Sequence, residues 1–278
     1  MKTQIKKFIQ FSCIAAVGGV VLASCHWSTK NEKLKFNPVL NKTYHFSLTK
    51  YSIKSWMYRS IPAEIYDTVY LNFSLQAIYK TDTSATCKFT LYDFIWKGKS
   101  KVNYQRDSLH ALSTNVVLSD SGIVQSVGDM DNILRDIEND NATGKYLREV
   151  IPDHISASAV TDLLNRIFSV IPAKVVEARD TWVTNITLNT NHPVNFSNFN
   201  ALKGYDDNTA LIEIQSNIFA RRSPGEESYI KGNQSGEAFI NSQTAIPYYY
   251  KTESEIITTT NYYDVKENEK FVLIKRAK

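Results

Sequence analysis

The chain has 278 residues, of which 43% are hydrophobic and 22% charged, and its formal net charge at pH 7 is +4. This length and apolar content suffice for a core, and we expect one β-rich domain over residues 36–278. The small net charge, with no cluster of lysine and arginine, argues against a nucleic-acid-binding protein.

The N-terminus has the composition of an export signal. Lys2, Lys6 and Lys7 precede an apolar run over residues 8–23 that contains no acidic residue. A transmembrane helix needs about 20 consecutive apolar residues, so this shorter run behind a basic start favours a secretory signal.

Residues 22–25, Leu-Ala-Ser-Cys, resemble the lipobox of bacterial lipoprotein precursors. The resemblance implies cleavage between Ser24 and Cys25, a diacylglycerol on the Cys25 thiol and a further acyl chain such as palmitate on its amine. Each buried methylene contributes about 0.8 kcal/mol, so two or three chains form a durable membrane anchor. The alternative is an ordinary cleaved signal, or an N-terminal anchor, in which Cys25 is incidental. We expect a signal peptide at 1–24, whose loss lowers the net charge to +1, and a polar tether at 25–35.

The residues after Cys25 favour the outer membrane. His26 stands where aspartate is associated with inner-membrane retention, and residues 26–33 lack the acidic pair associated with surface export. We therefore expect attachment at the periplasmic face. Besides Cys25, the mature chain retains only Cys87, so it has no disulfide framework and depends on its core for stability.

Apolar residues at every second position predict strands along most of the remaining chain. The clearest run is 69–79, preceded by 44–48 and followed by 87–91, where Cys87 points inward and the alternation slips near Asp93 to suggest a bulge. Further strands are expected at 112–118, 122–127, 182–189, 208–219, 227–241, 246–260 and 270–276, with turns at 119–122 and 241–244 and a bulge or turn at 232–237.

The period becomes helical between about residues 129 and 170. Stripes at three- and four-residue spacing begin at Met130 and again at Ala159, and Pro152 and Pro172 bound the second one. We therefore expect an α+β fold, in which a large curved antiparallel sheet forms an incomplete barrel. The central helical insertion would pack on its concave face.

Residues 166–182 resemble a Bacteroidota family of uncharacterised outer-membrane lipoproteins. That family has a helix with a phenylalanine, then Leu-Pro-x-Lys-x-Val and Gly-Asp-x-Trp, which here correspond to Phe168, Ile-Pro-Ala-Lys-Val-Val and Arg-Asp-Thr-Trp. The chain departs from the pattern at Arg179, where the family usually has glycine. The family has no established activity. The architecture resembles the periplasmic lipoprotein-carrier fold, in which an apolar cleft between sheet and helices holds acyl chains.

Two functions are compatible with these features. The resemblance to the carrier fold implies a lipid or another apolar or amphipathic ligand between sheet and helices. The candidate cleft residues are Val69, Leu71, Phe73, Leu75, Leu163, Ile167 and Phe168. The alternative is a non-enzymatic envelope module that contacts a protein or glycan through exposed tyrosines, for which the candidates are Tyr248, Tyr249, Tyr250, Tyr262 and Tyr263.

The sequence indicates no catalytic, metal or cofactor site, so we expect a protein that is not an enzyme. The five histidines show no metal-binding spacing, and an EF-hand loop at 129 or 136 would need glycine or glutamate where Leu134 and Leu147 stand. A short Bacteroidota O-glycosylation pattern, Asp followed by Ser or Thr and an aliphatic residue, marks Thr68 and Ser108 as candidates for modification.

Overall fold

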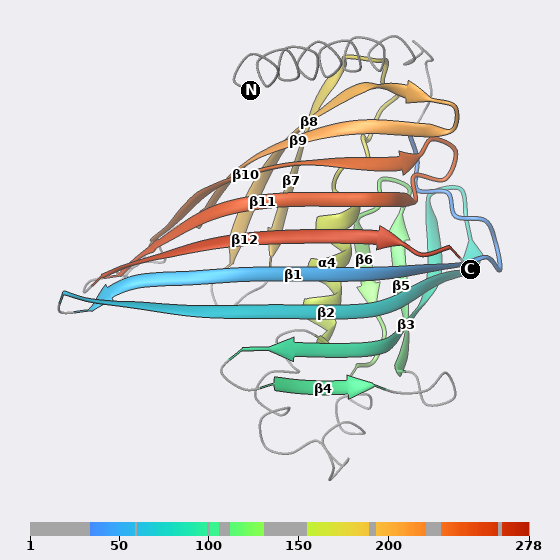
Figure 1. Cartoon of the computed structure of the whole chain (residues 1–278). Coiled ribbons are helices and arrows are strands. Elements are labelled where there is room, and N and C mark those ends of the chain that lie inside the picture. Colours follow the sequence, from blue (N-terminus) through green and yellow to red (C-terminus); the bar gives the residue numbers. More distant parts are fainter. Residues whose placement is uncertain are drawn as a thin grey trace, which may run out of the picture.

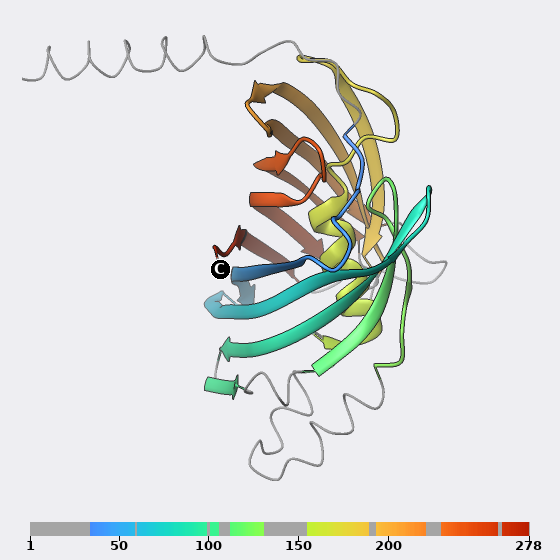
Figure 2. The ribbon, with the colours of Figure 1, turned by 90° about the vertical axis from the view of Figure 1, so that its right-hand side faces the viewer.

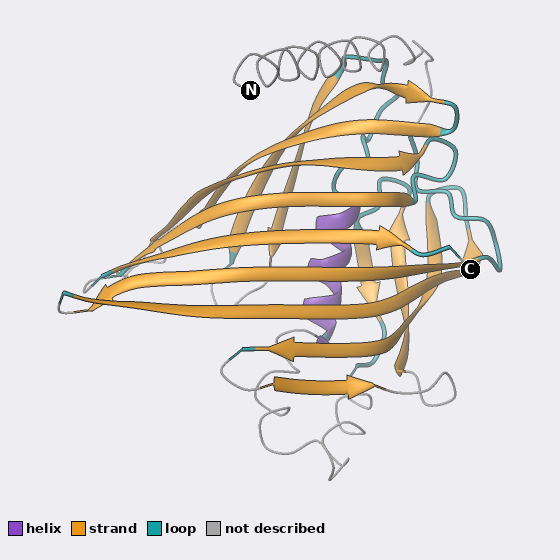
Figure 3. Ribbon diagram, viewed as in Figure 1, coloured by secondary structure: helices purple, strands orange, loops and turns teal. Residues whose placement is uncertain are grey.

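The computed structural model describes residues 34–58, 60–98, 101–105, 112–130, 155–188, 193–220, 229–260 and 263–277. Within these ranges the chain forms one twelve-stranded antiparallel sheet and one α-helix (Figures 1 and 3). The predicted signal peptide, Ser24, Cys25 and most of the tether lie outside the described residues.

The strands are β1 (Thr43–Tyr58), β2 (Ile61–Lys80), β3 (Ser84–Lys97), β4 (Lys101–Gln105), β5 (Leu112–Ser119), β6 (Val124–Val127), β7 (Thr181–Leu188), β8 (Val194–Asp206), β9 (Thr209–Ala220), β10 (Tyr229–Asn241), β11 (Pro247–Thr259) and β12 (Asp264–Lys275). Their order across the sheet is β6-β5-β3-β2-β1-β12-β11-β10-β9-β8-β7, and β4 pairs with β3. The first and last strands are therefore neighbours, with Phe46 opposite Lys275. All pairings are antiparallel. The paired strands follow one another in sequence, except that β1 pairs with β12 and β3 pairs with β5 as well as with β4.

The sheet curls around the helix α4 (Ala157–Phe168), which lies on its concave side (Figure 2). Ser156 caps the helix by accepting a hydrogen bond from the Ala159 amide at 3.2 Å. The helix contacts both edge strands, β6 and β7. At the β6 edge, the Val124 amide donates to the Asn165 side-chain oxygen at 2.8 Å, so α4 satisfies a backbone donor that the sheet leaves unpaired.

The main core lies between α4 and the concave face of the sheet. Val160, Leu164, Ile167 and Phe168 form the buried helix stripe at the spacing expected for one helical face. They face an inner sheet surface with stacked aromatic rings, including Phe46, Phe73 and Phe89, whose neighbouring centroids lie 5.2 and 5.3 Å apart. Each buried Å² of apolar surface contributes about 25 cal/mol, so this layer holds the helix on the sheet.

The structure confirms the large antiparallel sheet and revises the balance of the fold. The described residues are mostly β, so an α+β label overstates the helical part. Of the helical insertion predicted at 129–170, α4 forms its last part, and 131–154 lie outside the described residues.

Two local predictions on β3 are confirmed. Asn72 pairs with Asp93 and Phe73 with Leu91, so Tyr92 is the extra residue of a β-bulge next to the predicted position. Cys87 is buried, and burial raises the pKa of its thiol to about 12, so the thiol stays protonated at neutral pH.

Three segments correct the prediction. Strand β8 was not expected, and β12 begins at Asp264 rather than near residue 270. Residues 232–237 form neither a turn nor a bulge but regular strand pairing with β11. The glycines there allow close strand contact, because a Cβ on Gly236 would lie 2.1 Å from the Lys251 carbonyl oxygen.

The turn before β7 explains the motif at residues 179–182. Arg179 has φ of 79°, the left-handed conformation in which glycine is strain-free. The Asp180 carboxylate accepts a hydrogen bond from the Glu177 amide at 2.8 Å and closes the turn. Trp182 then enters the core as the second residue of β7. This left-handed backbone conformation favours glycine, and Arg179 adopts the conformation at a cost in strain energy.

We expect Arg179→Gly to raise the free energy of unfolding by about 1 kcal/mol, because it removes left-handed strain at an exposed position. Urea denaturation followed by circular dichroism measures this change. Arg179→Ala is the matched control, since alanine keeps the Cβ and gains nothing. Equal stabilisation by both substitutions would show that the arginine side chain, not the backbone, is responsible.

Candidate functional site

A row of polar side chains crosses the concave face of the sheet beneath α4. Cross-strand pairing places six buried residues in line, and we call this row the inner polar ladder. From β8 to β1 its members are Asn198, Ser216, Gln234, Ser254, Glu269 and Ser52. Buried polar groups are nearly always hydrogen-bonded, so the contacts of this row show which parts of the fold it connects.

Arg166 of α4 is the main partner of the ladder. The side chain is 8% exposed, and one terminal guanidinium nitrogen lies 2.5 Å from a Glu269 carboxylate oxygen. The other terminal nitrogen donates to Gln234 Oε1 at 2.9 Å and to Thr252 Oγ1 at 3.2 Å. The Phe271 ring lies under the guanidinium, with 4.4 Å between its centroid and Cζ. These contacts fix one charged side chain of the helix against three strands.

A hydrogen-bonded chain continues from Gln234 back to the helix. Gln234 Nε2 donates to Ser216 Oγ at 3.2 Å, and Ser216 Oγ donates to Asn198 Oδ1 at 2.6 Å. Asn198 Nδ2 donates to Ser169 Oγ at 3.0 Å, and this hydroxyl donates to the Arg166 carbonyl oxygen at 3.0 Å. The network therefore closes at the C-terminal end of α4, and the helix is held at two points.

Glu269 is ionised in this environment. Burial alone raises the pKa of its carboxyl, but the charges of Arg166 and Lys50 outweigh that effect and lower the pKa to about 2. The Lys50 ammonium lies 2.6 Å from the second carboxylate oxygen and reaches the network from β1. The buried acid thus has a cation on each oxygen, which offsets the cost of burying its charge.

A small cleft lies beside this network, between α4 and the sheet. Its volume is about 140 Å³, and its walls are mainly apolar. The lining residues are Leu48, Lys50, Val69, Leu71, Ala159, Asp162, Leu163, Arg166, Leu188 and Phe271. One of these lining residues, Arg166, has an Nε that is buried and has no hydrogen-bond partner among the described residues. An unsatisfied buried donor is costly in free energy, so a hydrogen bond from it to an acceptor would be favourable.

The structure brings three of the seven predicted cleft residues to this space: Val69, Leu71 and Leu163. The other four, Phe73, Leu75, Ile167 and Phe168, are each 1% exposed and fill the adjoining core. These four are therefore packing residues of the core.

The predicted tyrosine surface is revised in one position. Tyr250 is fully buried, with its ring edge-on to Phe271, so it is not a surface residue. Tyr248 and Tyr249 are half-buried, and both rings have neighbours within the sheet, Lys275 and Phe239 respectively. Tyr263 is half-buried, and Tyr262 lies outside the described residues. Of the glycosylation candidates, Thr68 lies within β2, and Ser108 lies outside the described residues.

The ladder and its arginine were not identified from the sequence. Their signal was present as polar residues at inward positions of strands, such as Asn198 and Asn200 in β8, and as Arg166 within an apolar helix stripe.

In the described part of the chain, no group of three or more His, Cys, Asp and Glu side chains could hold a metal ion. No helix in that same part is long and apolar enough to cross a membrane.

In the part of the chain that the structure describes, these features define a one-sheet β protein whose helix is joined to the sheet by a buried ionic network. The family of unknown function DUF6263 matches residues 97–247, more than half of the chain, and the chain belongs to this family. No curated protein matches the sequence of the chain.

The solved structures that match the chain share little sequence with it. The structure titled "Lipid-protein interactions in lipovitellin" has a TM-score of 0.48 and 11% identity over 86% of this chain and 25% of that chain. The chain thus spans about a quarter of the lipovitellin chain. An outer membrane channel from Pseudomonas putida F1 has a TM-score of 0.25 and 7% identity over 90% and 100% of the two chains. The outer membrane protein OprD from Pseudomonas aeruginosa has a TM-score of 0.20 and 7% identity over 87% and 61%. At TM-scores below 0.5, none of these likenesses bears on the function of the chain.

We expect Glu269→Gln to lower the free energy of unfolding at pH 7 by about 3 kcal/mol, because it leaves Arg166 buried without its counter-charge. The native pKa of Glu269 is depressed from 4.5 to about 2, so its contribution to stability is present above pH 4.5 and is lost as the pH falls towards 2. Urea denaturation between pH 2 and 7 should therefore show wild type and variant converging in acid.

Glu267→Gln, on the same strand, is the control. Its partner Lys54 lies 3.5 Å away, and both side chains are partly exposed, so the change should cost less than about 1 kcal/mol. If the two variants lost equal stability, or if the Glu269→Gln deficit did not shrink in acid, the buried pair would not be the stabilising element.

Proposed function

We propose that the protein is lipid-anchored at the periplasmic face of the outer membrane and binds the apolar end of an amphipathic ligand between α4 and the sheet. The observation that carries this proposal is the mainly apolar cleft, whose lining includes Arg166, a residue with a buried and unpartnered Nε. The lipobox-like residues 22–25 and the resemblance of residues 166–182 to Bacteroidota lipoproteins support the anchor and the location.

The size of the cleft limits what it can hold. A dry apolar cavity of about 150 Å³ accommodates a molecule such as benzene, whereas complete drug-sized ligands occupy about 300–1,000 Å³. At about 140 Å³, the cleft accommodates a short apolar group, such as the end of an acyl chain. The remainder of the ligand would lie outside the cleft.

The polar residues of the cleft favour an amphipathic ligand over a hydrocarbon. Ala159, Asp162, Leu163 and Arg166 follow one another at helical spacing along the cleft, so apolar and polar side chains alternate on that face of α4. A carbonyl, hydroxyl or carboxylate oxygen near Arg166 would satisfy its Nε–H. Lys50, partly exposed on the opposing strand, provides a second donor.

We expect Leu163→Trp to abolish ligand binding, because a larger ring at this half-buried position fills the cleft. The test uses Cys25→Ala protein exported behind a non-lipoprotein signal and purified without detergent. Native mass spectrometry detects a retained ligand, and calorimetric titration with unlabelled undecanoic acid measures binding of an added one.

Val183→Trp is the matched control, because Val183 is 54% exposed and lies outside the cleft. It should bind the fatty acid as the parent does, with Leu163→Trp at least about tenfold weaker, a loss of 1.4 kcal/mol or more. A parent protein that neither retains a ligand nor binds the probe contradicts the proposal. So does equal binding by both tryptophan variants.

We expect Cys25→Ala, in the full chain with its own signal, to lose all incorporation of labelled palmitate, because no other residue of residues 22–25 can form the thioether. Metabolic labelling in a diderm bacterial host measures this effect. Cys87→Ala is the control and should be labelled normally, because that thiol is buried in the folded protein. Retained labelling of the Cys25 variant would place the acylation elsewhere.

A further inference from the structure

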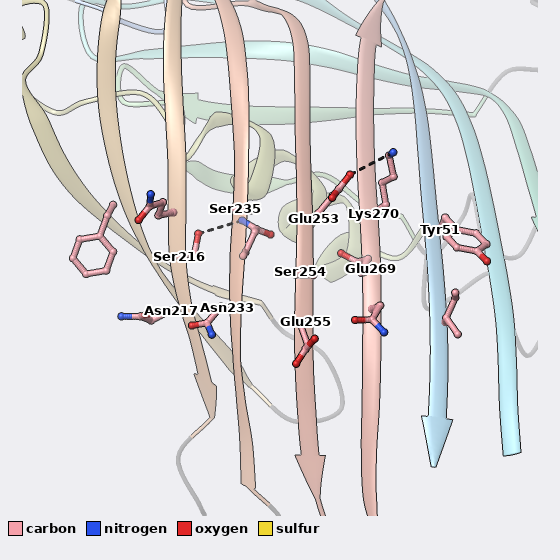
Figure 4. A pocket seen from close by; sticks show the side chains of 15 residues that line it. Tyr51, Ser216, Asn217, Asn233, Ser235, Glu253, Ser254, Glu255, Glu269 and Lys270 are labelled. Atoms are coloured by element: carbon pink, nitrogen blue, oxygen red, sulfur yellow. Dashed lines mark hydrogen bonds and ion pairs between the residues drawn. The ribbon is translucent and has the colours of Figure 1, made fainter. Parts of the chain in front are cut away.

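A shallow groove of about 890 Å³ crosses the outer face of the sheet, on the side opposite α4 (Figure 4). Cross-strand pairing arranges its first row of residues on six consecutive strands from β8 to β1. In order they are Phe199, Gln215, Ser235, Glu253, Lys270 and Tyr51. The row therefore has an aromatic ring at each end and polar side chains between them.

A second row runs parallel to the first, two residues further along each strand. Asn217, Asn233, Glu255, Asn268 and Ile53 face one another across neighbouring strands in this row. Figure 4 shows Asn217, Asn233 and Glu255 in line across the sheet. The groove thus presents amide, hydroxyl and carboxylate groups, which both donate and accept hydrogen bonds.

The dimensions of the groove favour an extended occupant. Six strands at the usual spacing place the two end rings about 24 Å apart, whereas the two rows lie only about 7 Å apart along the strands. A compact small molecule would leave most of such a track empty. A linear polymer lying across the strands would contact both rows and both rings.

The charges of the groove are paired with one another, which favours an uncharged occupant. Lys251 and Lys270 contact the same oxygen of Glu253, at 3.1 and 3.4 Å, and their hydrogen bonds and charges lower the pKa of that carboxyl. Lys266 lies 2.7 Å from Glu255. Three lysines and two glutamates take part in these pairs, so no large excess of either sign attracts a nucleic acid or an anionic lipid surface.

The end rings explain how such a polar track could bind with useful affinity. Phe199 is 47% exposed and Tyr51 is 37% exposed, although both are large side chains on regular strands. A sugar ring has an apolar C–H face that packs on an aromatic ring and hydroxyls that bond to amides and carboxylates. A protein partner, by contrast, would be expected to need an apolar centre, which this groove lacks.

We infer that this outer groove binds an uncharged linear carbohydrate chain, with Tyr51 and Phe199 as stacking platforms and the two polar rows as hydrogen-bonding partners. This site is separate from the proposed ligand cleft, because the sheet lies between them. Failure of either proposal therefore leaves the other intact.

The test is a glycan array of neutral and acidic linear oligosaccharides probed with the Cys25→Ala protein, followed by calorimetric titration of each bound sugar. Tyr51→Ala and Phe199→Ala should each weaken binding about fivefold, within the range measured for aromatic contacts. Phe219→Ala is the matched control, because that ring is 42% exposed on the same face of β9 and lies outside the groove. Thermal melts establish that all three variants are folded.

Binding of a neutral oligosaccharide that weakens in the two groove variants, and not in the control, supports the inference. Three results overturn it: no neutral oligosaccharide bound, acidic sugars bound in preference, or neutral binding that Tyr51→Ala and Phe199→Ala leave unchanged. Restoration of binding by Tyr51→Phe would further identify ring stacking, rather than the hydroxyl, as the contribution of Tyr51.

Discussion

The buried ion pair between Arg166 and Glu269 is the constraint around which the structure is arranged. A guanidinium in the protein interior is stable only with a counter-charge and with acceptors for its remaining hydrogens. Here the counter-charge comes from β12 and the acceptors from β10 and β11, so three strands and the helix must be in place together. The apolar stripe of α4 supplies most of the attraction to the sheet, but such contacts tolerate sliding. The ion pair fixes where along the sheet the helix lies, and through it the shape of the cleft.

The inner polar ladder also divides the apolar interior in two. The large core surrounds α4 on one side of it, and a smaller cluster of Ile186, Val194, Phe196 and Ile218 lies on the other. At the level of the ladder the sheet is polar on both faces, since the rows of the outer groove flank the same stretch of each strand. An antiparallel sheet ordinarily has one apolar and one polar face. This departure marks the middle of the long strands as the part of the fold that packing alone does not explain.

The alternation of apolar residues was enough to predict the strands whose inward positions are apolar, such as β2, and the helical stripe was enough to place α4. Strand β8 was missed because its inward positions include Asn198 and Asn200, so the apolar alternation stops halfway along it. The first half of β12 was missed for the same reason, with Glu269 at the inward position. The network could not have been predicted either, because its two charged members are 103 residues apart and only strand register brings them together. Tyr250 shows the reverse difficulty: its residue type suits a surface, but its place in the register faces the core.

The pairing of the first strand with the last has a consequence for how the chain reaches its native state. During synthesis β1 has β2 available at once, but its other neighbour, β12, follows all the other described strands in the sequence. The middle of the sheet thus joins two separately formed halves, one built outward from β2 and the other from β11. Contacts between residues so distant in sequence slow folding, since a large loop must close before they stabilise anything. Until β1 and β12 pair, each half of the sheet has an unpaired edge strand. These edges must be kept from pairing with other chains in the cell.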